Sequence, residues 1–416
     1  MNLLGTGDFT HPAWLAELKN KLEPAEEGLY RLKTPSYSPP IAGTGGERGA
    51  GISPSQREGG NGEGVRFILS AEISCIYSQD GKLRRVHYVL LLPSFSDVEK
   101  FNKTLVDHGG KLASDGRPIL GMNSKEVLKY LLDASPEGII IPAHAWTPYF
   151  GIFGSKSGFD SVEECFGDMT SYVYAIETGL SSDPAMNWRV SDTDKFAIIS
   201  SSDAHSLPRI GREATVFEIP ENELTFSEIH RIIKAKDRER FQFTIEYFPE
   251  EGKYHLDGHG NCKVSFIPEE TAKRHGQCPV CGKKLTIGVV SRVQDLADRA
   301  EGFTPPDAIP QRHLVPLEEV LADCLGVGAK SKSVQNVYWK LIDRAGSEFA
   351  VILDLPIPEV EKVGGEIVAE AVKRVREEKV HKTPGYDGVY GIIRVFTDKE
   401  REEFLAKGKG KQNSLF

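Results

Sequence analysis

The sequence predicts a mixed α/β protein that begins with a distorted β/α barrel. Short runs rich in β-branched residues alternate with amphipathic segments through residues 1–244, as strands alternate with helices in such folds. Several runs are almost continuously apolar, which is typical of buried parallel strands. Carboxylate and imidazole side chains follow the runs, at the position where parallel α/β folds carry their active sites.

Six apolar runs are the expected strands of this barrel. They read NLLGTG, VRFILSAE, RRVHYVLLLP, GIIIPAHA, YVYAIETG and FAIISSSDAH. Residues 12–22 and 124–134 are expected to be helices, and Pro12 suits the first turn of the former. Residues 34–64 are rich in Gly, Pro and Ser. They cannot bury enough apolar surface to offset the entropy of ordering, so we expect a flexible insertion there.

The composition changes beyond residue 244. Residues 245–290 hold three of the six cysteines and are expected to form a small zinc-binding domain. Residues 291–398 return to an α/β pattern, with helices expected in LEEVLADCLGV, SVQNVYWKLIDRAG and GEIVAEAVKRVREE and a strand in EFAVILDLP. Residues 399–416 are expected to be a flexible basic tail.

Bulk composition is ordinary for a soluble globular protein, with 39% hydrophobic and 27% charged residues. A net charge of -9 means that any nucleic-acid surface must be a local patch. No run approaches the ~20 apolar residues that a membrane span needs. The N-terminus has no basic segment followed by an apolar core, and the cysteine pattern indicates a reducing compartment. The cytoplasm is therefore the expected location.

Candidate metal ligands stand at or near the ends of the expected strands, and only His87 lies inside its run. Imidazole and carboxylate suit zinc, manganese or iron. Two or three such ions can activate a water and clamp both oxygens of a phosphoryl displacement. Each residue alone could instead be a helix cap or an interior hydrogen-bonding group, and Glu177 could pair elsewhere. The candidate ligands are Asp8, Glu72, His87, His144, Asp203 and His205.

The cysteine-rich stretch GHGNCKVSFIPEETAKRHGQCPVCGKKLT has the spacing of a structural zinc site. A Cys-x-x-Cys-Gly turn aims two thiolates at one ion, and a second ligand pair lies fifteen residues upstream. The expected ligands are His259, Cys262, Cys278 and Cys281. The fourth ligand stays open, because His255, Asp257 or His275 could replace His259. A redox role for Cys-x-x-Cys leaves the second pair unexplained.

The motifs GTGDFTHP, SAEIS, RRVHYVLLLP, PAHAWTP and SSDAHS resemble the PHP (polymerase and histidinol phosphatase) phosphoesterase domain. They resemble most closely its DNA-repair branch, the endonuclease Q family. This resemblance covers nearly the whole chain. It implies a distorted seven-stranded barrel with two or three divalent metals (Zn, Mn or Mg) held by the six ligands above, with His11 as a less certain member. It also implies nicking of DNA 5′ to deaminated bases (uracil, hypoxanthine, xanthine) or abasic sites.

The sequence departs from the resembled family at its front. The family's first strand carries a His-x-His motif, typically within DLHIHS, and this chain begins at what resembles the second strand. A barrel short of one strand has open edges, and a centre short of two imidazoles binds its ions weakly. The sequence therefore predicts impaired activity. A start codon assigned too far downstream and a catalytically dead paralogue both explain the difference.

Local basic and aromatic residues are the expected DNA contacts. Two arginines just after SSDAHS suit the grip of the scissile phosphate, and two lysines follow a glycine-rich turn that can present amides to a phosphate. Two tyrosines in a glycine-rich loop could stack an unpaired base or pack on the core. These residues are Arg209 and Arg212, Lys330 and Lys332, and Tyr386 and Tyr390. They make residues 291–398 the expected DNA- and lesion-recognition domain.

The last residues, QNSLF on a KGKGK tether, are similar to the peptide by which bacterial repair proteins bind the β sliding clamp. Gln412 would orient the peptide, and Leu415 and Phe416 would anchor it in an apolar groove. Two other functions stay open. One is a small-molecule phosphomonoesterase of the same barrel class, which would not need the zinc site or the tail. The other is a catalytically dead DNA-binding or clamp-bound module.

Overall fold

The computed structural model describes residues 3–33 and 64–412. Both helices predicted in the first half are present. α1 (Pro12–Lys21) starts at Pro12 after an extended His11. α3 (Ser124–Ala134) starts at a capping box in which the Asn123 side chain accepts from the Glu126 amide and Glu126 accepts from the Asn123 amide. The insertion predicted at 34–64 lies, except for Gly64, outside the described residues.

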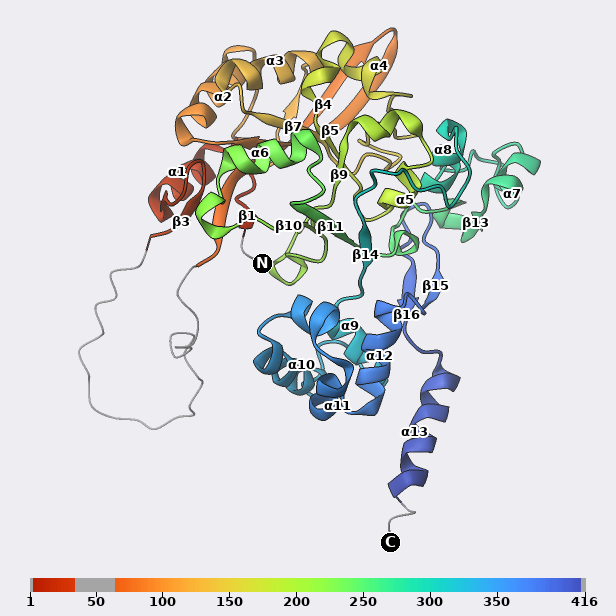
Figure 1. Cartoon of the computed structure of the whole chain (residues 1–416). Coiled ribbons are helices and arrows are strands. Elements are labelled where there is room, and N and C mark those ends of the chain that lie inside the picture. The colour runs from red at the N-terminus through yellow and green to blue at the C-terminus, as the bar shows by residue number, and fades with distance from the viewer. Residues whose placement is uncertain (1–2, 34–63, 413–416) are drawn as a thin grey trace, which may run out of the picture.

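A long antiparallel hairpin organises the first half of the chain (Figure 1). β4 (Arg66–Gln79) and β5 (Lys82–Leu92) pair continuously from Leu69↔Leu92 to Gln79↔Lys82. Asp80 and Gly81 close the hairpin with φ values of 51° and 72°, as a two-residue type I′ turn requires. The runs VRFILSAE and RRVHYVLLLP are thus two arms of one hairpin rather than parallel strands. Glu72 consequently lies within β4 rather than at its end, contrary to the sequence prediction.

This hairpin is the centre of a seven-stranded mixed sheet with the order β2-β3-β4-β5-β7, in which β1 and β6 also pair with β4. β1 and β6 run parallel to β4, whereas β3 and β5 run antiparallel to it. The remaining strands of this sheet are β1 (Leu3–Gly5), β2 (Leu22–Pro24), β3 (Tyr30–Leu32), β6 (Ile119–Leu120) and β7 (Ile139–Pro142).

Two smaller sheets continue the first half. β8 (Ala175–Glu177) and β9 (Ala197–Ile199) form a parallel pair. β10 (Ala214–Phe217), β11 (Phe241–Glu246) and β14 (Gln311–His313) form a three-stranded sheet. In the described ranges no strand hydrogen-bonds to both the large sheet and one of these sheets. The predicted mixed α/β class is confirmed, but the strands that the structure describes do not form a closed β/α barrel.

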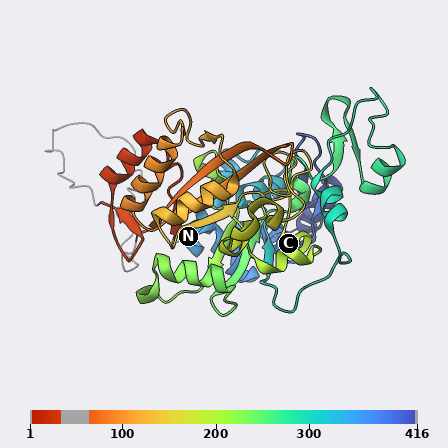
Figure 2. The same ribbon diagram turned by 90° about the horizontal axis from the view of Figure 1, so that it is seen from above.

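The helices of the first half pack on both sides of these sheets. α2 (Phe95–Asp107) and α3 lie side by side over the hairpin (Figures 1 and 2), where Phe101 and Leu128 enter the largest hydrophobic core. α6 (Phe226–Ala235) buries Ile229 and Ile232 against β7, β8 and β9. Short helices α4 (Val162–Phe166) and α5 (Pro184–Asn187) complete this part of the fold.

The cysteine-rich region is a small outlying unit at one side of the molecule (Figure 2). It consists of the hairpin β12 (Asp257–His259) and β13 (Val264–Phe266), the helix α7 (Pro268–Lys273) and the turn that follows it. α8 (Val289–Leu296) returns the chain to the main core through Val289 and Val293.

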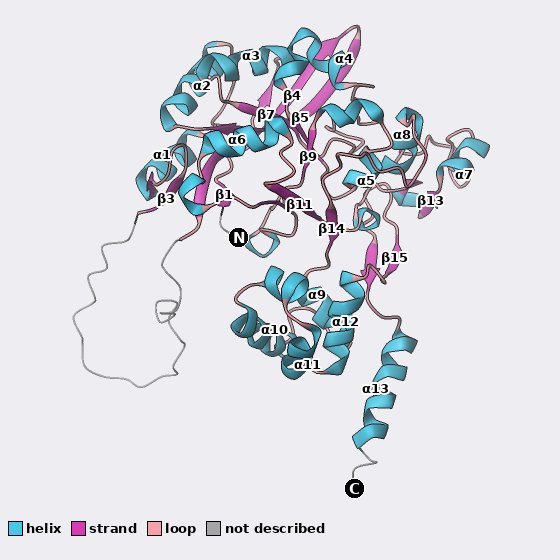
Figure 3. Ribbon diagram, viewed as in Figure 1, coloured by secondary structure: helices cyan, strands magenta, loops and turns pink. Residues whose placement is uncertain are grey.

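Four helices form a separate layer with its own core (Figure 3): α9 (Leu317–Leu325), α10 (Lys332–Ala345), α11 (Ile357–Gly364) and α12 (Glu366–Arg376). Three of them match the helices predicted for this region. The strand predicted in EFAVILDLP is wrong, because Ala350–Asp354 is a π-helical turn whose Val351 and Ile352 are buried in the helical core. A short apolar run cannot by itself distinguish a strand from a buried helical turn.

The hairpin β15 (His381–Thr383) and β16 (Ile392–Arg394) leads from this helical layer to α13 (Asp398–Gln412). α13 thus covers most of the segment predicted to be a flexible tail. In residues 3–33 and 64–412, no helix is long and apolar enough to cross a membrane.

Candidate active site

The β4–β5 hairpin brings a carboxylate and an imidazole together. Its register places Glu72 opposite Val89 and His87 opposite Ser74, so Glu72 and His87 are diagonal neighbours on one face of the sheet. The Nδ1 atom of His87 lies 2.9 Å from Oε1 of Glu72. His144 adds its Nε2 atom at 3.5 Å from the same oxygen and 3.1 Å from His87 Nδ1. One carboxylate oxygen and two imidazole nitrogens therefore converge, and we call these three residues the Glu72 cluster.

The ring of His144 is oriented by its own loop. Thr147 Oγ1 lies 2.8 Å from His144 Nδ1 and also 3.0 Å from the carbonyl oxygens of His144 and Tyr149. With the one hydroxyl proton donated to either carbonyl, Nδ1 of His144 is the donor to Thr147 Oγ1. The neutral His144 ring then carries its lone pair on Nε2, the nitrogen that a metal ion would bind, whereas the protonated ring donates from Nε2 to Glu72.

The surroundings of the Glu72 cluster keep the Glu72 carboxyl ionised. Burial opposes ionisation of Glu72, but hydrogen bonds from His144 and His87 outweigh it and hold the pKa of Glu72 well below its usual range. Burial lowers the pKa of His87. His144 is also buried, yet its hydrogen bond to Glu72 raises its pKa. Glu177 accepts the His144 amide at 2.8 Å, and burial raises the pKa of Glu177 to about 7.

The other three predicted ligands lie outside this tight group. Among the described residues only Glu72, His87 and His144 have donor atoms within 4.8 Å of one another at this site. Asp8 and Asp203 line a cavity of about 1360 Å³ that also opens on Glu72 and His144. Nε2 of His205 lies 3.4 Å from Asp203 Oδ1, and its side chain is 76% exposed.

Three of the predicted ligands share an unusual backbone conformation. Asp8, His144 and Asp203 follow β1, β7 and β9, with φ values of 48°, 33° and 41°. Residues other than glycine rarely adopt positive φ, at a cost of about 1–3 kcal/mol each, and such residues cluster at functional sites. This shared conformation is independent support for a site at these strand ends.

Arg117 is the charged neighbour of the Glu72 cluster that the sequence did not single out. Its Nη1 atom lies 3.2 Å and 3.1 Å from the two carboxylate oxygens of Glu72. It comes from the loop between α2 and β6, 45 residues along the chain from Glu72. No local motif marks it, because the contact depends on how this loop lies across β4.

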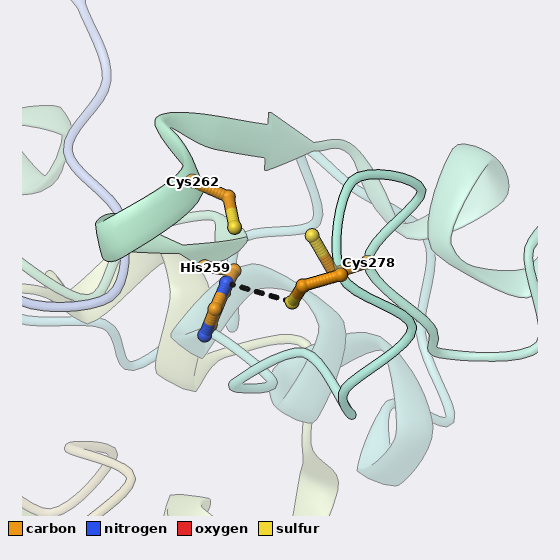
Figure 4. Close-up of side chains that lie close together, drawn as sticks. His259, Cys262 and Cys278 are labelled. Atoms are coloured by element: carbon orange, nitrogen blue, oxygen red, sulfur yellow. Dashed lines mark hydrogen bonds between the residues drawn. The ribbon is translucent and has the colours of Figure 1, made fainter.

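A second group of potential metal ligands lies in the cysteine-rich region. His259, Cys262, Cys278 and Cys281 have donor atoms within 4.8 Å of one another. Figure 4 shows His259, Cys262 and Cys278 facing one point. Cys281 Sγ lies 3.6 Å from His259 Nδ1. Burial opposes ionisation of Cys278, but the amides of Cys281 and Val280 lower its pKa to about 7. One nitrogen and three sulfurs are a donor set that suits zinc.

The two predicted phosphate-gripping arginines meet at a separate cavity of about 400 Å³. Arg209 Nη1 lies 3.0 Å from Glu319 Oε1 and 3.5 Å from the Tyr247 hydroxyl. Arg212 donates to the carbonyl oxygens of Ser202 and Asp203 at 2.6 Å and 3.0 Å. The cavity is lined by Leu180, Arg209, Arg212, Tyr247, Glu251, Gly252, Glu319 and Tyr390.

The two predicted base-stacking tyrosines differ in their surroundings. Tyr390 is 61% exposed and lines the 400 Å³ cavity. Tyr386 packs against Gly258, where an added Cβ would lie 2.6 Å from its ring. Lys330 and Lys332 are exposed at the start of α10. Leu415, Phe416 and the side chain of Gln412 lie outside the described residues.

Comparisons with known proteins agree with the architecture. Residues 316–379 match the family model of the MJ0043 C-terminal domain. The chain is 31% identical over 252 residues to MJ0043 of Methanocaldococcus jannaschii, which covers 60% of this chain and 31% of that protein. It is 28% identical over 352 residues to YqxK of Bacillus subtilis, which covers 83% of this chain and 84% of that protein.

Two solved structures are similar over nearly the full length. The crystal structure of the lesion-specific endonuclease PfuEndoQ from Pyrococcus furiosus has a TM-score of 0.77 at 29% identity, over 95% of this chain and 87% of that one. Endonuclease Q in complex with a 27-mer duplex substrate with an abasic lesion at the active site has a TM-score of 0.77 at 30% identity, over 96% and 89%.

These similarities define the class of protein to which the chain belongs. The chain is a mixed α/β protein with a helical domain of the MJ0043 C-terminal type. At 30% identity over most of both chains, it belongs to the endonuclease Q family.

Proposed function

We propose that the chain is a metal-dependent DNA endonuclease that nicks the strand 5′ to an abasic site or a deaminated base. The observation that carries this proposal is the likeness to lesion-specific endonucleases over 95–96% of the chain. One of those structures holds a substrate with an abasic lesion. Abasic DNA is therefore the first substrate to test, and DNA containing uracil, hypoxanthine or xanthine is the second.

The donors of the Glu72 cluster fit a divalent metal ion, because two imidazole nitrogens and an ionised carboxylate are ligands that zinc and manganese accept. A bound ion would supply a water nucleophile at neutral pH and would offset charge on the phosphate. Glu72, His87 and His144 would hold it, and Thr147 would fix the tautomer of His144. We assign Asp8, Asp203 and His205 to further ions, which would require these side chains to move closer to the cluster.

The 400 Å³ cavity is proposed to receive the damaged nucleotide. Arg212 connects it to the strand end that carries Asp203, so a nucleotide there would be next to a phosphate at the metal site. Tyr390 offers an exposed ring for stacking. Lys330 and Lys332 would hold the duplex backbone as part of a DNA-recognition domain at 291–398. The His259–Cys281 group would hold one structural zinc.

Nicking is tested with end-labelled duplexes that carry one abasic site, one deoxyuridine or no lesion. We expect a single cut 5′ to the lesion, none in undamaged DNA, and loss of cutting after chelation. A generic phosphomonoester and a binding assay on the same duplexes separate the alternatives. Hydrolysis of the phosphomonoester alone would support a small-molecule phosphatase. Lesion binding without cutting would support a catalytically dead module and the impairment that the sequence predicts.

We also propose that QNSLF binds the bacterial β sliding clamp. Its support is the sequence pattern of Gln412, Leu415 and Phe416. A chain ending at residue 411 should lose clamp pull-down and keep its activity on naked DNA. Equal clamp retention by both chains would refute this part of the proposal.

A further inference from the structure

We propose that Arg117 binds the scissile phosphate at the Glu72 cluster. This inference rests on the proposed function and adds to it the residue that holds a non-bridging phosphate oxygen. The arginines that the sequence favours for this role are engaged elsewhere, with Arg209 on Glu319 and Arg212 on backbone carbonyls. Among the arginines that the structure describes, Arg117 contacts the cluster itself.

The guanidinium of Arg117 retains binding capacity. Within residues 3–33 and 64–412, its side chain donates only through Nη1, to both oxygens of Glu72. The N–H groups on Nε and Nη2 remain for a ligand, and the side chain is 37% exposed. An arginine fork matches the oxygens of a phosphate in a two-point contact. An arginine that only balanced the charge of Glu72 would not need an exposed side chain or N–H groups that remain for a ligand.

The loop that carries Arg117 is fixed to the strand that carries Glu72. The amide of Arg117 donates to Asp115 Oδ1 at 2.9 Å, which holds the turn. The next residue, Pro118, accepts the amide of Ser74 at 3.0 Å. β6 then continues along β4 in parallel register, starting at Ser74. Because Ser74 is two residues from Glu72, this pairing holds the loop where the Arg117 guanidinium contacts the Glu72 carboxylate.

Gly116 shows how closely this loop approaches a second candidate ligand. A Cβ atom at this position would lie 2.5 Å from Oδ2 of Asp8, a distance that real Cβ contacts do not reach. The Thr10 hydroxyl also donates to the Gly116 carbonyl at 3.4 Å. The loop therefore contacts both Asp8 and Glu72. A phosphate held by metal ions bound to these carboxylates would lie within reach of Arg117.

The test compares Arg117→Ala and Arg117→Lys with wild type, using Arg31→Ala as a matched control. Arg31 is an exposed arginine on β3 that pairs with Glu23 on the neighbouring strand β2. In single-turnover nicking of an abasic duplex, Arg117→Ala should be about 100- to 1000-fold slower, the usual cost of removing one donor to a developing charge. Added guanidinium ion should restore part of the rate. Arg117→Lys should be intermediate, and metal content and thermal unfolding should match wild type.

A second measurement does not depend on nicking. Inorganic phosphate is titrated by calorimetry into the metal-loaded proteins. It should bind Arg117→Ala more weakly than wild type, and it should bind the Arg31→Ala control as tightly as wild type. If wild type does not nick but its phosphate binding depends on Arg117, the proposed function fails and the phosphate-binding role stands. If Arg117→Ala nicks within threefold of wild type, or binds phosphate as well, the role is refuted. Loss of rate together with loss of metal, without guanidinium rescue, would show a charge-balancing role instead.

Discussion

The Glu72 cluster and the cysteine-rich site are held in different ways. Two members of the Glu72 cluster lie on the long strands β4 and β5, which pack into the largest hydrophobic core, and His144 follows β7. Other protein groups contact each member: Arg117, Thr147 and Phe150. The cysteine-rich site lies between three-residue strands and a short helix. From residue 255 to 287, only Cys278 and Leu285 are buried hydrophobic side chains.

This difference indicates two roles for bound metal. In the Glu72 cluster the fold positions the donors, so an ion there would add chemistry to an existing arrangement. In the cysteine-rich site the side chains have few partners other than one another, and Val280 at its tip is 69% exposed. An ion there would supply the cohesion that the missing core does not.

The largest effect is expected when the cysteine-rich site loses its ligands. The double variant Cys278→Ser and Cys281→Ser should lose one zinc per chain and make residues 255–287 sensitive to protease. A structural zinc site contributes about 10–16 kcal/mol of binding energy to local folding, which one buried leucine cannot replace. Metal analysis and limited proteolysis are the measurements. A protease-resistant, zinc-free double variant would show that this region folds without metal.

Replacing the carboxylate of the Glu72 cluster should affect chemistry and leave the fold intact. Glu72→Gln keeps the shape and removes the charge, so nicking should fall by about 1000-fold, or about 4 kcal/mol, through loss of the metal. The structural zinc should remain, which makes this variant the reciprocal control for the cysteine variant. Loss of both metals from Glu72→Gln would contradict the independence of the two sites.

A third ionic group, centred on His313, is held by hydrogen bonds to other protein residues. Its contribution to the stability of the fold should depend on pH. His313 is buried, with Nε2 3.1 Å from Asp183 and Nδ1 3.0 Å from Glu378. Burial opposes protonation, but these bonds raise the pKa of His313 to about 9. Since a free histidine titrates near pH 6.5, this contribution is complete below that pH and is lost as the pH rises through about 9.

The effect at His313 should be on the order of 3 kcal/mol. Denaturant unfolding between pH 6 and pH 10 should show wild type losing stability above neutrality. His313→Gln should be less stable at pH 6 and should lack most of this loss. Parallel curves for the two proteins would mean that other groups cause the pH dependence.

The smallest effect is expected at Thr147, which contacts the far nitrogen of His144. Thr147→Val preserves the shape and removes the acceptor, so metal affinity at the Glu72 cluster should weaken about 10- to 100-fold. Competition with a chelating dye measures the affinity. Thr104→Val is a matched control, because among the described residues the Thr104 hydroxyl bonds only to the Lys100 carbonyl on α2. If Thr147→Val binds metal as tightly as wild type, a group other than Thr147 sets the tautomer of His144.

The sequence identifies the helices and the cysteine-rich site because both have local signals. The helix at 124–134 has a complete capping box, and the cysteines lie in one short stretch. The β4–β5 hairpin also has a local signal, the Asp80-Gly81 pair, which is typical of type I′ turns. The apolar runs alone do not contain this signal. They predict that the strand ends at Glu72, whereas β4 continues to Gln79.

Arg117 could not be predicted in the same way. Its partner is 45 residues away, and the contact arises from a loop laid across β4, which no periodicity records. The sequence also could not predict which of the six candidate ligands lie close together. Apolar runs in the sequence mark all of them, but the pairing register and the loop conformations decide that Glu72, His87 and His144 meet while Asp203 and His205 pair with each other.

The two-residue turn of the β4–β5 hairpin has a consequence for the order of folding. Hairpins closed by such turns form in about 1–10 μs, long before distant segments find one another. Glu72 and His87 are 15 positions apart and are brought together by this hairpin alone, whereas His144 arrives through the later antiparallel pairing of β7 with β5. During synthesis, two of the three donors would thus meet on the nascent chain before the segment that carries the third has emerged.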